Sequence, residues 1–445
     1  MNSTKINRRV IYFISFIIIV AICITVISFG ILFEFVNPQQ ESNDFPDSLF
    51  ISIYNNQFVV NGSKFYFAGA NFWQAMNLAI DGTNGNRTRL NLELDSLKQL
   101  GVTNLRIMAA SEGPNSEPYR MTPALLISPG EYDATVFDGL DYLLKQLKLR
   151  GMQAVMVLNN YWQWSGGMAQ YVSWYENSTI PYPPENDWNT FITYSSRFYQ
   201  YEECQTWYKN HIQTIINHTN PYTGLKYNED PTIFSWELAN EPRNFPTKWS
   251  SHTAEYIKSL DPNHMVTTGC EGDHEWDGLD YSGVHENSFI DYLTVHIWPQ
   301  NWGWYIPNSP STYGSAESNS LSYLHKNMAI ANSLNKPLIL EEFGLARDWN
   351  SYQDIFNSDS STTYRDRFYS IIYDEVFNSA VSGGLLAGSN FWVWSGQSRP
   401  GDKWIGDPPH ETPGWYSVYD EDNSTLDIIS AHAEDMNQLP TLHSS

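Results

Sequence analysis

Eight short apolar segments, each followed by a stretch with helical spacing, constrain the fold of this chain more than any other feature. Continuous apolar runs of this kind are typical of parallel strands that are buried on both faces and connected by helices. Eight is also the number of strands that closes a (β/α)₈ barrel, and the length of chain from residue 50 onward fits one. The predicted strands are Phe65–Trp73, Val102–Ala109, Gln153–Asn160, Thr232–Glu241, Met265–Glu271, Tyr292–Trp298, Pro337–Gly344 and Leu385–Trp394.

The alternative fold is an open, doubly wound sheet. Such a sheet more often has a glycine-rich phosphate loop after its first strand, and the sequence Ala70–Trp73 is not such a loop. A pair of short strands turned at Asn55-Asn56 predicts a β-hairpin before the barrel. The predicted helices run near Leu92–Leu100, Leu140–Leu147, Trp207–Ile216, Ala254–Leu260, Leu321–Leu334 and Tyr364–Ser382.

The N-terminus carries an apolar segment without charge, Val10–Phe33, preceded by three basic residues. About 20 apolar residues span a bilayer, and the basic flank should stay in the cytoplasm. We therefore expect a transmembrane signal anchor with an extracellular catalytic domain. The alternative is secretion after signal cleavage near Ser28–Gly30. The predicted boundaries are 1–9 for a cytoplasmic tail, 10–33 for the anchor, 34–49 for a linker and 50–445 for a single catalytic domain.

The charge and the aromatic content limit the partners of the exported part. A formal net charge of −24 argues against nucleic acid and against docking on anionic lipid. Aromatic residues make up 15% of the chain, with 17 Trp and 28 Tyr, which is typical of a surface that binds carbohydrate or peptide. We expect a monomer.

Two of the predicted strands end in motifs that contain glutamate. The fourth ends in Trp236–Arg243, which reads WELANEPR, and the seventh ends in Leu340–Gly344, which reads LEEFG. In a barrel these strand ends face one cavity, so one carboxyl group from each strand would meet there. Glycoside hydrolysis requires such a pair, one protonated to serve the leaving oxygen and one ionised to attack the sugar or to activate water.

Alternation along a strand decides which glutamates can take part. Glu341 and Glu342 are expected to point to opposite faces, so that only one enters the barrel mouth. Glu237 lies four residues before Glu241 and is expected deeper in the barrel, further from substrate. Each acid taken singly could be a capping or salt-bridged residue, but the two motifs together indicate catalysis.

Five stretches distributed along the predicted barrel carry recognisable motifs: Asn159–Gly167, Trp236–Arg243, His296–Trp302, Pro337–Gly344 and Asn390–Trp394. On these motifs the chain resembles glycoside hydrolases of family 5 (clan A), and within that family the endo-β-1,4-mannanases. The Asn-Glu-Pro and Glu-Phe-Gly pieces are shared across the wider family. The His-Ile-Trp-Pro and Asn-Glu-Pro-Arg pieces are more specific to mannanases.

The resemblance implies roles for the matching positions. Glu241 would be the acid/base and Glu342 the nucleophile, with Asn240 holding the 2-hydroxyl of the substrate. Arg106 would steady the nucleophile through a charge-assisted contact, and His296 matches the active-site histidine.

Further implied roles fall to side chains around the sugar. Trp392 would be the platform under the ring at the cleavage site, and Arg243 a contact on the leaving-group side. Trp298 stands where many relatives carry Tyr, so the nucleophile would lose a phenolic hydrogen bond if nothing replaces it. Loop aromatics expected to stack on sugar are Trp162, Trp164 and Trp302.

No metal site and no cofactor are predicted. His274 and His285 stand beside acids, but there is no HExxH motif, and we expect both to be solvated loop residues.

The sequence thus predicts a retaining endo-mannanase that acts on mannan, glucomannan or galactomannan. Retention requires the two carboxyl groups about 5–5.5 Å apart, whereas about 6.5–9.5 Å indicates inversion. One alternative is a cellulase-like β-1,4-glucan endo-hydrolase that uses the same two acids. Another is a non-catalytic surface protein that binds carbohydrate.

Overall fold

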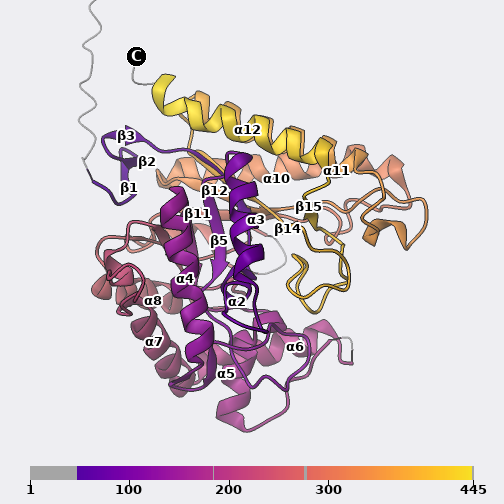
Figure 1. Ribbon diagram of the computed structural model, residues 1–445. Coiled ribbons are helices and arrows are strands. Elements are labelled where there is room, and N and C mark those ends of the chain that lie inside the picture. The colour runs from indigo at the N-terminus through magenta and orange to yellow at the C-terminus, as the bar shows by residue number, and fades with distance from the viewer. Residues whose placement is uncertain (1–47, 184, 275–277, 443–445) are drawn as a thin grey trace, which may run out of the picture. The chain divides into compact units, whose positions relative to one another are not determined.

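The centre of the molecule is a sheet of eight parallel strands (Figure 1), seen in a computed structural model that describes residues 48–183, 185–274 and 278–442. The strands are β4 (Phe67–Asn71), β5 (Asn104–Met108), β8 (Gln153–Val157), β9 (Ile233–Glu237), β10 (Met265–Thr267), β11 (Leu293–Ile297), β12 (Leu338–Phe343) and β13 (Leu386–Phe391). Each predicted strand is confirmed, although the observed strands are shorter.

The sheet curls until its two edge strands meet. Its order is β10-β9-β8-β5-β4-β13-β12-β11, so strands that are neighbours along the chain are neighbours in space. Across the remaining gap, the amide of Asp291 donates to the carbonyl of Val266, and that of His296 to Glu271, each at 2.8 Å. This near-closed sheet is consistent with the predicted (β/α)₈ barrel and excludes the open sheet.

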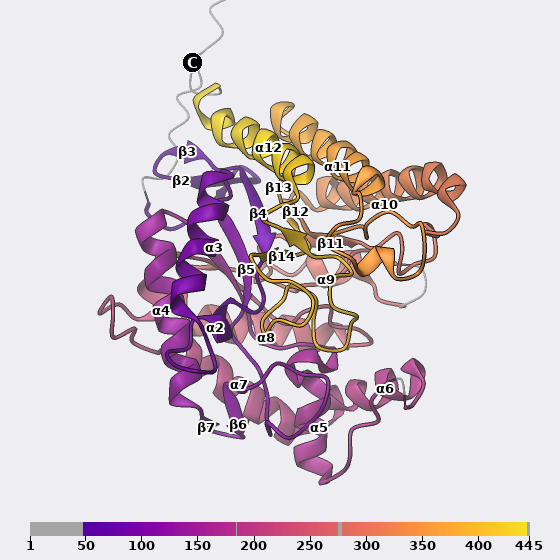
Figure 2. The ribbon, with the colours of Figure 1, turned by 45° about the vertical axis from the view of Figure 1, so that its right-hand side comes forward.

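Helices cover the outside of the barrel, and at least one follows every strand (Figure 2). They are α2 (Ala75–Leu78), α3 (Arg87–Gln99), α4 (Ala134–Arg150), α5 (Gly167–Glu176), α6 (Trp188–Ser195), α7 (Glu202–Ile216), α8 (Thr247–Leu260), α9 (Tyr281–His285), α10 (Tyr313–Leu334), α11 (Thr363–Val381) and α12 (Asn423–Leu442). The predicted helices are confirmed, whereas α2, α5, α6, α9 and α12 had no counterpart among them.

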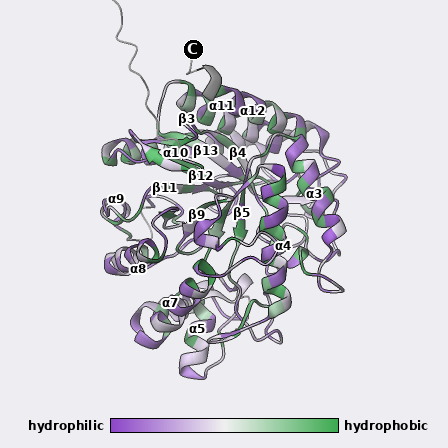
Figure 3. Ribbon diagram, turned by 60° about the vertical axis from the view of Figure 1, so that its left-hand side comes forward, coloured by the Kyte–Doolittle hydropathy of each residue, from purple (hydrophilic) through white to green (hydrophobic). Residues whose placement is uncertain are grey.

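The helix α4 illustrates how local sequence fixes these elements. Its N-cap, Asp133, accepts hydrogen bonds from two amides of the first turn, and Gly151 ends the helix in the left-handed conformation. Its leucines at helical spacing are buried against the barrel, while Leu149 on the outer side is exposed. The same mixture of hydrophobic and hydrophilic residues is visible on the other helices in Figure 3.

The predicted hairpin is present and closes the N-terminal end of the barrel. Strands β1 (Ser52–Tyr54) and β2 (Gln57–Val60) pair antiparallel, and β3 (Ser63–Lys64) adds a third short strand. Phe58 of the hairpin packs edge-on against Phe234 and Tyr292, with ring centroids 5.3 and 5.6 Å apart. Aromatic side chains therefore fill this end, which leaves the opposite end for a polar site.

The predicted membrane anchor at 10–33 and most of the linker at 34–49 lie outside the described residues. Within residues 48–442, apart from the short gaps, no helix is long and apolar enough to cross a bilayer. Cys204 and Cys270 are both buried thiols and form no disulfide.

Candidate active site

Glu241 is held in a tight loop just beyond the end of β9. Its backbone φ is +47°, an uncommon conformation for a residue with a side chain, and its amide donates to the carbonyl of Gly269 at 3.0 Å. Gly269 itself has φ +77°, and a Cβ there would lie 2.0 Å from the carbonyl oxygen of Ala239. Only glycine allows the loops after β9 and β10 to approach this closely.

Glu342 lies near the C-terminal end of β12, and a β-bulge changes the direction of the residue before it. Val295 pairs with Leu340, but the next residue of β11, His296, pairs with Glu342. The expectation that Glu341 and Glu342 point to opposite faces is wrong, because the extra residue in the ladder breaks the alternation. Glu341 instead lies 3.5 Å from His296 and is buried together with Glu342.

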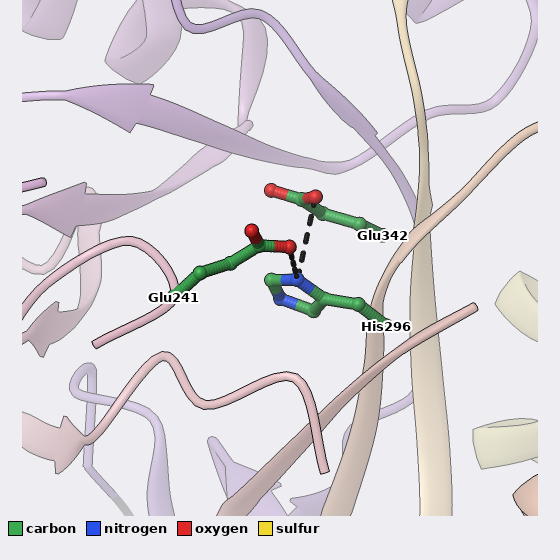
Figure 4. Close-up of side chains that lie close together, drawn as sticks. All are labelled: Glu241, His296 and Glu342. Carbon is green, nitrogen blue, oxygen red and sulfur yellow. Dashed lines mark hydrogen bonds and ion pairs between the residues drawn. The ribbon is translucent and has the colours of Figure 1, made fainter. Parts of the chain in front are cut away.

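Glu241 and Glu342 both approach the same nitrogen of His296 (Figure 4). His296 Nδ1 lies 2.7 Å from Glu241 Oε1 and 3.3 Å from Glu342 Oε2. One oxygen of each carboxylate and one imidazole nitrogen all lie within 4.8 Å of one another. Two carboxylates this close together resemble the arrangement in retaining glycosidases, whose acids lie nearer to each other than those of inverting enzymes. The same three groups are also the described set whose spacing would suit a single metal ion.

Arg106 is the buried cation below this pair. It forms two hydrogen bonds with Glu237, at 2.8 and 2.6 Å, and a third contact joins its Nη1 to Glu342. Its Nη2 also donates to Asn240 Oδ1 at 2.8 Å, which orients that amide. The predicted contact between Arg106 and Glu342 is confirmed, and so is the deep position of Glu237, which is fully buried.

The protonation of the site follows from these contacts. Burial alone would lower the pKa of His296, but the charge of Glu342 and the hydrogen bond with Glu241 raise it to about 10. Burial would raise the pKa of Glu241, but the bond with cationic His296 lowers it. Burial raises the pKa of Glu342 against the pull of His296 and Arg106. In the resting site His296 is therefore protonated, and it is hydrogen-bonded directly to the Glu241 carboxylate.

Trp162 contacts the acid rather than presenting a free ring. Its indole Nε1 donates to Glu241 Oε2 at 2.6 Å. The guanidinium of Arg243 lies 4.8 Å from the centre of its ring, and Arg243 is in turn paired with Glu271 at 2.8 Å. The prediction that Trp162 stacks on sugar is not tested by these contacts, but one face of the ring is already occupied.

A cavity of about 730 Å³ opens above Glu241 and Glu342. Asn240 and Arg243 also line it, which places both at the predicted site. Its tryptophans are Trp162, Trp164, Trp188, Trp298, Trp302, Trp392 and Trp415. An aromatic cleft around two carboxylates provides flat apolar faces for sugar rings and polar groups for their hydroxyls.

Trp298 does not take the place of a tyrosine hydroxyl as a hydrogen-bond donor to Glu342. It packs edge-on against Trp392, with ring centroids 5.8 Å apart, and it adjoins Tyr416 at 5.0 Å. The polar contacts to Glu342 come from Arg106 and His296. Trp298 and Trp392 thus form two adjoining walls at the cleavage centre.

Several residues of the cleft were not predicted from the sequence. Glu271 could have been found, because it is the last residue of a predicted strand and such ends face the cleft. No feature of the sequence indicates that Trp188 on α6 or Trp415 lines the cleft. The expectation that His274 and His285 are solvated is wrong, because both are buried. His274 bonds to the hydroxyl of Tyr323 at 3.0 Å, so packing and hydrogen bonding explain it.

Comparison with known proteins supports the same assignment. A family model described as glycoside hydrolase family 5, β-mannosidase-like, matches residues 48–441. The chain belongs to glycoside hydrolase family 5. Its match covers the whole described barrel, including both strand ends that carry the glutamates.

Several known proteins resemble the chain over most of its length. A putative mannan endo-1,4-β-mannosidase 9 of Oryza sativa subsp. japonica is 30% identical, over 88% of this chain and 90% of that protein. A family 5 mannosidase from Rhizomucor miehei is 37% identical with a TM-score of 0.85, over 89% of this chain and 100% of that chain. An endo-1,4-β-mannanase from the same organism is 25% identical with a TM-score of 0.65, over 87% and 99%.

Proposed function

We propose that the protein is a retaining, endo-acting glycoside hydrolase that cleaves β-1,4-mannosidic bonds by double displacement. The observation that carries this proposal is the spacing of Glu241 and Glu342, whose carboxylate oxygens approach within 4.8 Å at the open end of the barrel. That distance leaves room for an anomeric carbon but not for an additional water molecule between the acids.

In the first step Glu342 attacks the anomeric carbon, and the bond from that carbon to the leaving oxygen breaks. The electron pair goes to the oxygen, which takes a proton from Glu241. The proton shift from His296 Nδ1 to Glu241 Oε1, over 2.7 Å, prepares the acid and leaves a neutral imidazole. Burial raises the pKa of Glu342, and the cationic His296 and Arg106 oppose this shift and so favour the carboxylate that attacks.

In the second step water attacks the same carbon from the opposite face. Glu241, now a carboxylate, removes a proton from that water, and the ester bond to Glu342 breaks. Two inversions give overall retention. Glu342 is released as a carboxylate, Glu241 is protonated again, and the site is ready for the next turnover.

The substrate class rests on the relatives. The enzymes from Oryza sativa and Rhizomucor miehei are named for mannan or mannosides, and the chain resembles them over at least 87% of its length. Asn240, oriented by Arg106, is the group that would read the 2-hydroxyl, which is axial in mannose and equatorial in glucose. The names therefore favour mannan over a β-glucan substrate.

Product analysis tests this proposal. On linear β-1,4-mannan we expect a mixture of short oligosaccharides from the first minutes of reaction, and on glucomannan a similar pattern. On carboxymethylcellulose we expect no release of reducing ends. Faster cleavage of carboxymethylcellulose than of mannan would contradict the proposal that mannan is the substrate. Binding of mannan without release of reducing ends would contradict the proposal that the protein is an enzyme.

The second candidate is a mannosidase that releases single sugars from chain ends. It is favoured by the greater similarity to the Rhizomucor miehei mannosidase, with a TM-score of 0.85, than to the endo-mannanase, with 0.65. The same product analysis separates the two, because a mannosidase would release mannose alone at early times.

We infer further that the enzyme is exported and anchored in the membrane. The support is the uncharged segment 10–33 behind three basic residues. Mass spectrometry of the N-terminal peptide from the mature protein would find residues 1–9 if the anchor is retained. An N-terminus near residue 30 would mean secretion.

A further inference from the structure

We propose that Trp162 is a positioning residue for the acid, whose indole N–H holds Glu241 Oε2 as an acceptor and so favours Glu241 Oε1 as the site of the transferable proton. This inference rests on the proposed function. It assigns to Trp162 a part in proton transfer in place of a sugar-stacking role.

The contact itself is short and directed at the reacting group. Trp162 Nε1 lies 2.6 Å from Glu241 Oε2, and the other oxygen, Oε1, lies 2.7 Å from His296 Nδ1. An indole nitrogen can only donate, and a carboxylate oxygen is a better acceptor than a protonated one, so this bond disfavours a proton on the oxygen that faces the indole. His296 Nδ1 can either donate or accept. The two oxygens of Glu241 are therefore distinguished by their partners.

The indole is held in this position from several sides. Arg243 lies over the ring at 4.8 Å, and Phe191 of α6 is stacked with it at 6.3 Å with an interplanar angle of 16°. Trp188 packs against it edge-on at 5.6 Å. A ring so enclosed offers little free face to a sugar, whereas its N–H edge points at the acid.

Asn160 ties the Trp162 loop to the loop of the acid. Its side-chain oxygen accepts from the amide of Trp162 at 3.0 Å and from the side-chain amide of Asn240 at 3.1 Å. Asn160 is fully buried. The Trp162 backbone is thus fixed relative to the residue that immediately precedes Glu241, so the indole and the carboxylate keep their alignment.

Loss of the indole bond should shift a pH dependence. The indole N–H of Trp162 stabilises the ionised form of Glu241, so removing this hydrogen-bond donor raises the pKa of Glu241. The first step needs the proton that His296 and Glu241 share, and the alkaline limb of kcat/KM reports the loss of that proton from the pair. Other ionisable groups that face Glu241 are His296 from β11, Glu342 from β12, Arg243 from its own loop, Glu271 and His274 from the loop after β10, and His410 and Glu411 from the loop 397–416.

The test is Trp162→Phe, which keeps an aromatic ring and removes the N–H. The alkaline limb is expected to move up by about one to two pH units. For mannohexaose kcat/KM at the original optimum should fall roughly tenfold, because proton donation to the leaving group is impaired. For 2,4-dinitrophenyl β-mannobioside, whose leaving group needs no proton, it should change less than about twofold.

Trp415→Phe is the matched control, because Trp415 also lines the cleft but packs on Tyr416, with ring centroids 4.9 Å apart, rather than on Trp162. We expect it to leave the alkaline limb in place. If Trp162→Phe also leaves the limb in place and slows both substrates equally, Trp162 only binds sugar and the proposal is wrong.

A measurement on the unsubstituted protein covers the case in which Trp162→Phe does not fold. With ¹⁵N-labelled indoles, one N–H resonance should titrate along the alkaline limb and should shift in Glu241→Gln. If every indole resonance stays unchanged through that range and in Glu241→Gln, the proposal is contradicted. Absence of mannan cleavage by the wild-type protein would refute the proposed function separately, since the resonance is observed without substrate.

Discussion

Replacing Glu342 with alanine is expected to lower mannan hydrolysis at least about 10⁴-fold while the protein stays folded. The variant lacks the group that attacks the anomeric carbon, and neither Arg106 nor His296 can form the same ester. The rate of reducing-end release, together with circular dichroism, measures the effect. Glu434→Ala is the matched control, because Glu434 is an exposed glutamate of α12 and its loss should leave the rate unchanged.

Azide distinguishes a lost nucleophile from general damage. With 2,4-dinitrophenyl β-mannoside, azide should enter the space vacated in Glu342→Ala and give α-mannosyl azide. In Glu241→Ala azide should instead attack the intact intermediate and give β-mannosyl azide. Full activity of Glu342→Ala, or the same azide product from both variants, would contradict the assigned roles.

Arg106→Met is expected to cause the largest loss of stability. Arg106 is buried and contacts Glu237 and Glu342 directly, with Glu341 at 3.6 Å. Removing this cation leaves several carboxylates buried without their partner, which costs about 3–5 kcal/mol in the free energy of unfolding. Denaturant unfolding of the purified variant measures this loss.

Two further variants make this stability test specific. Arg367→Met removes an ion pair with Glu317 whose arginine side chain is 58% exposed, and it should cost no more than about 1 kcal/mol. Glu237→Gln added to Arg106→Met should recover part of the lost stability, because one uncompensated charge is removed. Equal stability of Arg106→Met and the wild type would show that Arg106 does not neutralise these acids.

The barrel could be predicted from the sequence because each of its strands is buried on both faces. Runs such as Val102–Ala109 and Gln153–Asn160 carry apolar residues without alternation, and helical spacing between them implies parallel crossovers. The ends of two of these strands carry Glu241 and Glu342, which the sequence therefore predicts to be the catalytic pair. The helix α12 was not predicted, because a long loop with two short strands, β14 (Trp394–Gly396) and β15 (Val418–Tyr419), separates it from the eighth strand of the barrel.

Side-chain directions at the site were less predictable. A strict alternation placed Glu341 and Glu342 on opposite faces, but the bulge opposite His296 brings both to the imidazole. Nothing in the local sequence marks this bulge. The indole bond from Trp162 to Glu241 likewise joins two loops whose relative position depends on the whole barrel.

Trapping of the covalent intermediate tests the central claim most directly. The wild-type protein is incubated with 2-deoxy-2-fluoro-β-mannosyl fluoride, and its peptides are mapped by mass spectrometry. We expect a single fluoromannosyl label, attached to Glu342 through an ester. A label on Glu341 or on another residue, or products of inverted configuration without any label, would contradict a double displacement by Glu342 and Glu241.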